Sequence, residues 1–343
     1  NLLLIVFLVL FSSSERVLEY VLVICFAWLL QFAMTIPCIV REKFRLIPGL
    51  HFRDPDLRLF ARTTVVTVFT TSIFLLCYLA DSNTVSAFGS GAVSAVYYAD
   101  KLFTPVATTL IYSISVVLFP KYNLTYSQVN AQEYKRYVGG TVENTLFVIL
   151  PFSALFSAFA VPIIHVLFES GNFNTVSTQM TSSVFAMYAL GMAGFCVLDL
   201  INKAYYTMHK TLTPLLINAV VLALNIALNL VFRSGQSCGL IARTTAVSLT
   251  VGGVIALVCF FRDTRGSLRT GKLLKNLAAA VLTGAAMWGC ETLLYRPGLS
   301  KLLTLLEFCA LGLVGIGLYA GICWLLRERE ALQTIVQKFR KRA

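Results

Sequence analysis

Charged side chains are scarce in this chain: Asp, Glu, Lys and Arg together make up 13% of its 343 residues. A soluble protein needs roughly a quarter of its residues charged to cover its surface. Hydrophobic residues account for 57% of the chain, and the mean hydropathy is +0.78. This composition excludes a soluble enzyme, a disordered protein and a small disulfide-rich scaffold, and it predicts a polytopic membrane protein.

The sequence also lacks the usual motifs of catalysis. Its three histidines, His51, His165 and His209, are scattered and form no metal-binding motif with one another. It contains no Walker-type phosphate loop. The nine cysteines form no Cys-x-x-Cys pair, and we interpret them as small buried apolar residues. We therefore expect no enzymatic activity, no cofactor and no metal site.

In place of such motifs the chain has apolar segments of about 20 residues or more, long enough to cross a bilayer. Because an open sheet is not tolerated in lipid, we expect these segments to be helices. Residues 2–11 are apolar but too short to span, and we expect them to be the end of a tenth, clipped span. The fold class predicted is an all-α bundle of nine full spans plus this one. The nine segments are residues 17–40, 63–80, 92–119, 142–168, 179–201, 214–232, 240–261, 277–294 and 302–326.

The positive charge follows a topological pattern. The net charge is +12, from 28 Lys and Arg against 16 Asp and Glu. If the segments alternate across the membrane, 22 basic residues fall on one side, five on the other, and one, Lys101, lies inside a segment. Basic loops stay in the cytoplasm, so we expect the C-terminus there, and the charge requires no nucleic-acid partner. The opposite connections, such as Asp81–Gly91 and Glu169–Thr178, are expected to be short outer loops.

Asp100 and Lys101 are the most informative polar residues, because an ionisable side chain inside the membrane is costly. At 1.5 Å per residue, Lys101 lies roughly 15 Å into its segment, near the midplane. Adjacent helical residues point about 100° apart, so these two side chains need not neutralise each other. One interpretation is that each pairs with another helix. The interpretation we favour is a polar cavity in which Lys101 binds an anionic substrate.

Other ionisable residues in the segments allow two interpretations each. Asp199 and Lys203 are four residues apart near a cytoplasmic end, which suits a local salt bridge as well as a substrate contact. Glu143 lies close to the cytoplasmic boundary, and Glu307 about one and a half turns in from the outer one. We keep Glu307, Asp199 and Lys203 as possible cavity-lining residues.

Asn218, Asn225 and Asn229 recur on one face of a single segment. Such a stripe either makes interhelical hydrogen bonds or forms the wall of a wet cavity. Three prolines inside the segments each remove a backbone hydrogen bond and favour a kink; they are Pro105, Pro151 and Pro162. Broken helices around polar midplane residues are typical of secondary transporters.

Several of these residues belong to recognisable motifs. The run Ser94–Leu102, with Tyr97-Tyr98-Ala99-Asp100-Lys101 at its centre, resembles the SxxxYYADRL signature of the MurJ (MviN) lipid II flippase family, part of the MOP exporter superfamily, although Ser94 lies one residue closer to the tyrosines than in the signature. Leu167–Phe173 is similar to the family's LFERGxF loop, and Asn225–Leu230 to its NIxLNL helix. The motifs keep the family's order over roughly residues 25–262.

The resemblance implies a MATE-like transporter with fourteen helices in two lobes around a central cavity. Residues 1–62 would be a remnant of the N-terminal lobe, with a clipped helix 5, helix 6 and a cytoplasmic linker. Residues 63–262 would form the C-terminal lobe, 263–326 the helix 13–14 pair with a groove for the lipid tail, and 327–343 a basic cytoplasmic tail. On this alignment the chain lacks most of the N-terminal lobe.

The function implied is translocation of lipid II, the undecaprenyl-pyrophosphate-linked peptidoglycan precursor, across the bacterial cytoplasmic membrane by alternating access. The implied partners are this lipid, membrane lipid and a coupling ion or the membrane potential, with the protein a monomer. Lys101 matches a cavity arginine of the family, but lysine lacks the bidentate fork that suits phosphate. Two alternatives are another MOP-superfamily exporter, for drugs or a different lipid-linked glycan, and a truncated membrane protein that does not transport.

Overall fold

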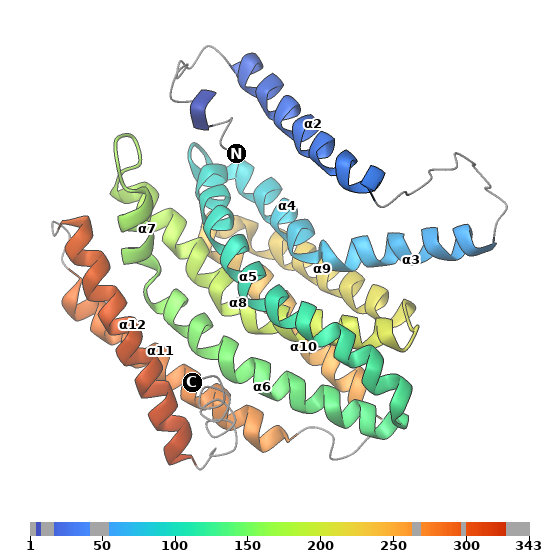
Figure 1. Cartoon of the computed structure of the whole chain (residues 1–343). Helices are drawn as coiled ribbons and strands as arrows, with labels where there is room; N and C mark the ends of the chain where they lie inside the picture. Colours follow the sequence, from blue (N-terminus) through green and yellow to red (C-terminus); the bar gives the residue numbers. More distant parts are fainter. Residues whose placement is uncertain (1–4, 8–16, 42–54, 263–268, 296–299, 327–343) are drawn as a thin grey trace. The chain divides into compact units, whose positions relative to one another are not determined.

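The computed structural model describes residues 5–7, 17–41, 55–262, 269–295 and 300–326. Within these ranges the chain forms α-helices and two short 3-10 helices, and it contains no strand (Figure 1). The helices are α2 (Val17–Arg41), α3 (Pro55–Thr71), α4 (Ile73–Val85), α5 (Ala92–Gln128), α6 (Ala131–Ala158), α7 (Ala160–Phe168), α8 (Thr175–Thr207), α9 (Leu212–Phe232), α10 (Cys238–Phe261), α11 (Thr270–Leu294) and α12 (Lys301–Leu325).

The nine predicted spans are confirmed in the described residues. Eight single helices are long and apolar enough to cross a membrane, and α3 with α4 makes a ninth, bent by 54°. The predicted clipped span lies mostly outside the described residues.

The contacts divide the chain into two units, residues 1–59 and 60–343. In the first unit α2 exposes large apolar side chains along its length, among them Trp28 at 71% and Phe32 at 65%. The second unit is a packed bundle, which contains every residue discussed below.

Three predicted boundaries are wrong. The segment 63–80 is interrupted at Ser72, and the segment 142–168 is interrupted at Phe159, where α6 ends and α7 begins. The second break has a visible cause, because the ring of Pro162 conflicts with the carbonyl four residues earlier, at Ala158. By contrast, α5 runs unbroken through Pro105 and α6 through Pro151.

The third wrong boundary concerns Asp81, which was expected in an outer loop. Helix α4 continues to Val85, and Asp81 lies on its buried face together with Phe74, Cys77 and Val85. The polar run that follows the apolar segment is therefore still part of the transmembrane helix.

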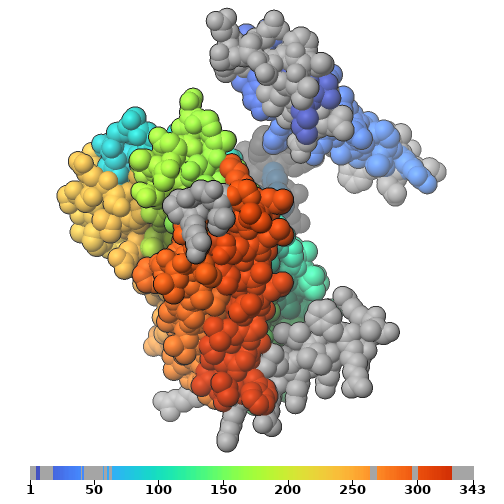
Figure 2. Space-filling view, turned by 90° about the vertical axis from the view of Figure 1, so that its left-hand side faces the viewer, coloured from blue at the N-terminus to red at the C-terminus, as the bar shows by residue number. Residues whose placement is uncertain are grey.

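Helix α8 is the axis of the second unit: 78% of its most apolar window is buried. It packs against α5, α6 and α10, while α11 and α12 lie side by side along one face of the bundle (Figure 2). Small residues allow the closest approach, as in other helix pairs in membranes. A Cβ added to Gly194 on α8 would lie 2.6 Å from the Cα of Thr250 on α10.

We predict that Gly194→Ala lowers the free energy of unfolding in detergent by about 1–3 kcal/mol, because the added methyl group must push the α10 backbone away. The matched control is Gly289→Ala on α11, where a Cβ meets no atom within 4 Å. Unfolding followed by tryptophan fluorescence measures both variants. Equal stability of the two variants would contradict the close α8–α10 contact.

Candidate functional site

One exposed row of α5 is polar at four of its five positions although the helix crosses the membrane. Tyr97, Lys101, Pro105, Thr109 and Ser113 follow one another at four-residue intervals, and all five are exposed. A spanning helix surrounded by lipid would present apolar side chains there. We call this stripe the α5 face; its composition suits contact with water or a polar ligand.

Lys101 is the charged group of the α5 face. Its ammonium nitrogen lies 5.1 Å from the centroid of the Tyr97 ring. No carboxylate in the described ranges forms a salt bridge with it, and the carboxylate of the adjacent Asp100 accepts a hydrogen bond from Thr104 Oγ1 at 2.7 Å. Of the two interpretations of Lys101, pairing with another helix therefore finds no support among the described residues.

Asp199 and Lys203 do form the local salt bridge that their spacing suggests. Lys203 Nζ lies 2.8 Å from Asp199 Oδ2, and the hydroxyl of Ser115 on α5 donates to the same oxygen. The Lys203 ammonium also lies 5.2 Å from the centroid of the Tyr112 ring. The charge of Lys203 is neutralised by Asp199 on the same helix, whereas Lys101 forms no such salt bridge with a described carboxylate.

The sequence analysis missed a second polar centre, which surrounds Asp81. Its Oδ1 accepts hydrogen bonds from Asn225 Nδ2 at 3.2 Å and Asn229 Nδ2 at 2.9 Å. Its Oδ2 accepts from Thr245 Oγ1 at 2.6 Å and Tyr188 OH at 3.1 Å. These five residues, the Asp81 cluster, join α4, α8, α9 and α10, and Asp81 itself is 0% exposed.

The Asp81 cluster contains a carboxylate but no basic side chain, and the described residues give Asp81 no ion pair. A second acceptor, the buried Oδ1 of Asn225, has no hydrogen-bond partner. An isolated charge in such a place costs several kcal/mol unless it is neutralised. Carboxylate, amide and hydroxyl oxygens are also the ligands that hard cations prefer. The cluster can thus hold a proton or a small cation.

The asparagine stripe on α9 serves interhelical hydrogen bonding, the first of its two interpretations. Asn225 and Asn229 bind Asp81, and Asn218 Nδ2 donates to Asn202 Oδ1 at 3.3 Å and to the Pro214 carbonyl at 2.7 Å. All three are at most 2% exposed. Asn229 in addition lines a pocket of about 480 Å³ between α4 and α9.

Comparison with known proteins identifies the family. The family model described as the lipid II flippase MurJ matches residues 1–309. The chain belongs to the MurJ family. The family is one of transporters, and the chain spans about half the length of the curated relatives it matches.

Two such relatives are probable lipid II flippases. The one from Buchnera aphidicola subsp. Acyrthosiphon pisum is 27% identical over 233 residues, which are 67% of this chain and 45% of the relative. The one from Vibrio cholerae is 23% identical over 309 residues, or 88% of this chain and 58% of the relative. A solved structure of a lipid II flippase MurJ in an inward closed conformation aligns with a TM-score of 0.71 at 20% identity. It covers 93% of this chain and 65% of that one, and it supports the fold.

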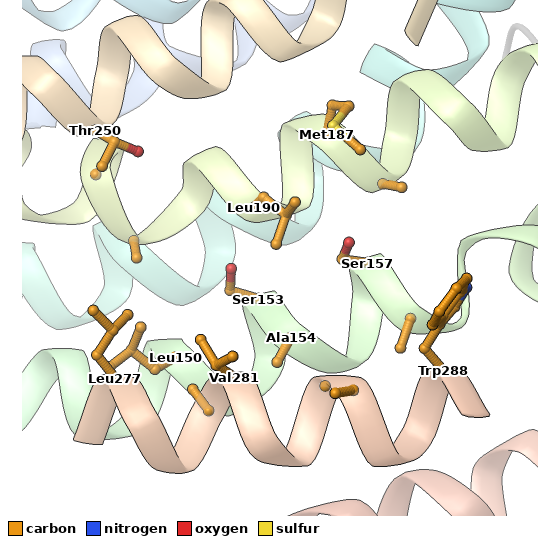
Figure 3. A pocket seen from close by; sticks show the side chains of 17 residues that line it. Leu150, Ser153, Ala154, Ser157, Met187, Leu190, Thr250, Leu277, Val281 and Trp288 are labelled. Carbon is orange, nitrogen blue, oxygen red and sulfur yellow. The ribbon is translucent and has the colours of Figure 1, made fainter. Parts of the chain in front are cut away.

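Two grooves of this MurJ family member are lined mainly by apolar side chains. The larger, of about 640 Å³, runs between α6, α8 and α11, and no charged residue lines it (Figure 3). The hydroxyl of Ser153 at its base is already used, because it donates to the Ala189 carbonyl at 2.6 Å. The other groove, of about 490 Å³, lies between α6–α7 and α12 and includes Phe152, Phe159 and Phe308. Neither groove suits a charged head group.

The two other acids that the sequence analysis named inside the segments lie outside both polar centres. Glu143 is 4% exposed and accepts a hydrogen bond from the Arg269 backbone N–H at 2.7 Å, at the start of α11. Glu307 on α12 is half-buried. Neither contacts Lys101 or Asp81.

We predict that Asn225→Leu lowers the free energy of unfolding by about 1–3 kcal/mol, because it leaves buried oxygens of Asp81 and Thr245 with one donor fewer. The control is Asn83→Leu, the same replacement at an exposed position of α4. The midpoint of denaturant unfolding measures the difference. If Asn225→Leu were no more harmful than Asn83→Leu, the Asp81 cluster would not stabilise the bundle.

Proposed function

We propose that the complete protein moves lipid II across the bacterial cytoplasmic membrane by alternating access. The family and the names of the relatives support this function. The observation that carries it is Lys101: an exposed cation without a partner carboxylate, on a polar face of a membrane-spanning helix. Such a group suits a substrate whose head is anionic and whose passage lies within the membrane.

In this mechanism Lys101 binds the diphosphate of the substrate as a point charge. Thr109 and Ser113 are further along the same exposed face and supply hydroxyl donors at one-turn intervals. No covalent bond forms or breaks. The head group must be bound in both access states, and it must also be released. Contacts to a flexible lysine suit both requirements.

The lipid tail requires a separate, apolar path. The groove between α6–α7 and α12 supports this role because aromatic and aliphatic side chains line almost all of it. Helix α12 lies in the pair that the family resemblance assigns to the lipid-tail groove. The head and the tail of the substrate are then held by different helices of the second unit.

We assign ion coupling to the Asp81 cluster. A proton would neutralise Asp81 and weaken the hydrogen bonds that it accepts from α8, α9 and α10. A monovalent cation would neutralise Asp81 and hold the same helices through side-chain oxygens. The pocket between α4 and α9 supports access, since Asn229 lines it together with Asn83, Thr84 and Arg233. A ligand that binds one access state better than the other shifts the equilibrium by that difference in affinity.

The proposed topology has the basic loops and the C-terminus in the cytoplasm, following the distribution of Lys and Arg. The protein would act as a monomer in the inner membrane. Export of a drug or of another lipid-linked glycan remains the alternative. Rescue of a strain depleted of its own lipid II flippase separates these functions, because only lipid II transport restores cell-wall synthesis.

We predict that Lys101→Ala in the complete reading frame lowers the appearance of precursor in the outer leaflet by roughly 10-fold to 100-fold, the effect of losing a charged hydrogen bond. Lys101→Arg should keep most of the activity, because it keeps the charge. Lys121→Gln, at an exposed position near the end of the same helix, is the control. Wild-type growth and precursor levels with Lys101→Ala would contradict the assignment.

We also predict that the thermal midpoint of the purified protein rises by roughly 5 °C or more when the coupling cation saturates the Asp81 cluster. Titrations with Na⁺, with K⁺ and with acid identify the ion. Asp81→Asn should abolish the response, whereas Glu307→Gln should retain it. A response that persists in Asp81→Asn would place the ion elsewhere.

A further inference from the structure

A third polar site lies at the end of the bundle opposite the basic loops. A pocket of about 380 Å³ is formed by the start of α5, the loop before α8 and the first two turns of α8. Its polar lining consists of Ser90, Ser94, Tyr98, Asn174, Ser177 and Thr181, and no charged side chain lines it. We propose that this pocket binds an oxyanion, either a phosphate ester or free phosphate.

The start of α5 supplies unused backbone donors. The N-cap residue is Gly91, in the left-handed region at φ 89°, and it has no side chain to accept from the first N–H groups. The residues before it, Gly89 and Ser90, complete a short glycine-rich loop, with Gly89 also at positive φ. A glycine-rich loop leading into a helix N-terminus is a common arrangement for binding phosphate. The first N–H groups of a 37-residue helix therefore point to a site with a positive potential.

Thr181 independently indicates a ligand. It lines the pocket, it is 0% exposed, and its hydroxyl has no hydrogen-bond partner. A buried hydroxyl without a partner costs about 1–3 kcal/mol. Several threonines on these helices avoid this cost by donating to the carbonyl four residues earlier, as Thr207 does to Lys203 and Thr250 to Ala246. An oxyanion in the pocket would accept from Thr181 and from the free N–H groups together.

The N-terminus of α8 is already capped by a side chain, and this limits where the anion can bind. Asn174 caps α8, with its Oδ1 accepting from Ser177 N at 3.0 Å and Ser177 Oγ at 3.2 Å. Its amide nitrogen is left as a further donor for the pocket. The anion site is thus centred on α5 and bordered by the cap of α8.

Glu169, in the loop between α7 and α8, is engaged away from the pocket. Its Oε2 accepts from Thr178 Oγ1 at 2.6 Å and lies 3.0 Å from His165 Nδ1. The hydrogen bond from Thr178, together with His165, holds the pKa of this carboxyl below its ordinary value. Glu169 is not among the residues that line the pocket, so no lining carboxylate repels an anion there.

Aromatic contacts connect the pocket to the α5 face. Tyr98 lines the pocket, with its ring centroid 5.4 Å from that of Phe173 and 5.7 Å from that of Tyr97. Tyr97 in turn lies beneath the Lys101 ammonium. Affinity for an anion does not depend on the proposed function. If that function holds, the pocket lies where the substrate diphosphate leaves the membrane interior.

Thermal unfolding of the purified full chain in detergent tests the site. Sodium phosphate and farnesyl diphosphate are titrated separately, against sodium chloride at equal ionic strength and pH. We expect both phosphate compounds to raise the midpoint. A response to both assigns the pocket to a lipid head group, and a response to inorganic phosphate alone assigns it to the free anion.

Two variants tie the response to the pocket. Thr181→Val removes the hydroxyl while keeping the shape, and it should weaken the apparent phosphate affinity about 10-fold. Thr250→Val, whose hydroxyl is satisfied within its own helix, is the matched control and should leave the affinity unchanged. Ser94→Asp places a carboxylate in the first turn of α5, so it should raise the midpoint without phosphate and abolish the phosphate response.

Three results would overturn the proposal. One is that phosphate stabilises the protein no more than chloride does. Another is that Thr181→Val and Thr250→Val have equal phosphate affinities. The third is that Ser94→Asp, which is expected to fold at least as well as the wild type, still responds fully to phosphate.

Discussion

The bilayer offers no hydrogen-bond partner, and this constraint explains how the charged residues and most of the asparagines discussed above are placed in the second unit. A polar group must bind another part of the protein or face water. Asp199, with Lys203 and Ser115, takes the first course, and so do Asp81 and the asparagines of α9. Lys101 is exposed and forms no salt bridge with a described carboxylate, so the second course is the one we propose for it. The contrast between the neutralised Lys203 on α8 and Lys101 on α5 is the basis for proposing a structural role for the first and a binding role for the second.

The same constraint explains why α8 is the axis of the bundle. Glycine and alanine let α10 approach it closely, and its polar side chains reach α4 and α5 instead of lipid. The Asp81 cluster therefore joins the helices that surround the axis, and a change in its charge acts on four helices at once. The exposed α5 face, by contrast, is free to interact with a ligand without disturbing the core.

Hydropathy alone was enough to predict the nine spans, because their length and composition are set by the bilayer. It failed at Ser72 and Phe159, since an apolar run does not reveal where its helix bends, although Pro162 was a usable signal for the second break. It also failed at Asp81, whose polar neighbours Ser82, Asn83 and Thr84 resemble a loop. The signal that could have placed Asp81 in a helix was its helical spacing from Phe74, Cys77 and Val85. The residues that donate hydrogen bonds to Asp81, however, lie 107 to 164 residues away along the chain. Lys101 could be found because a single residue in an apolar run is visible without knowing the fold.

The central claim is that Lys101 faces water near the middle of the membrane while Asp81 is enclosed by protein. Cysteine labelling in whole membranes tests it most directly, with the native cysteines replaced and a water-soluble maleimide as the reagent, since the thiolate reacts only where water reaches it. The structure predicts rapid labelling of Lys101→Cys and slow labelling of Asp81→Cys, whose position is 0% exposed. Labelling of Lys101→Cys as slow as that of Asp81→Cys would contradict the account.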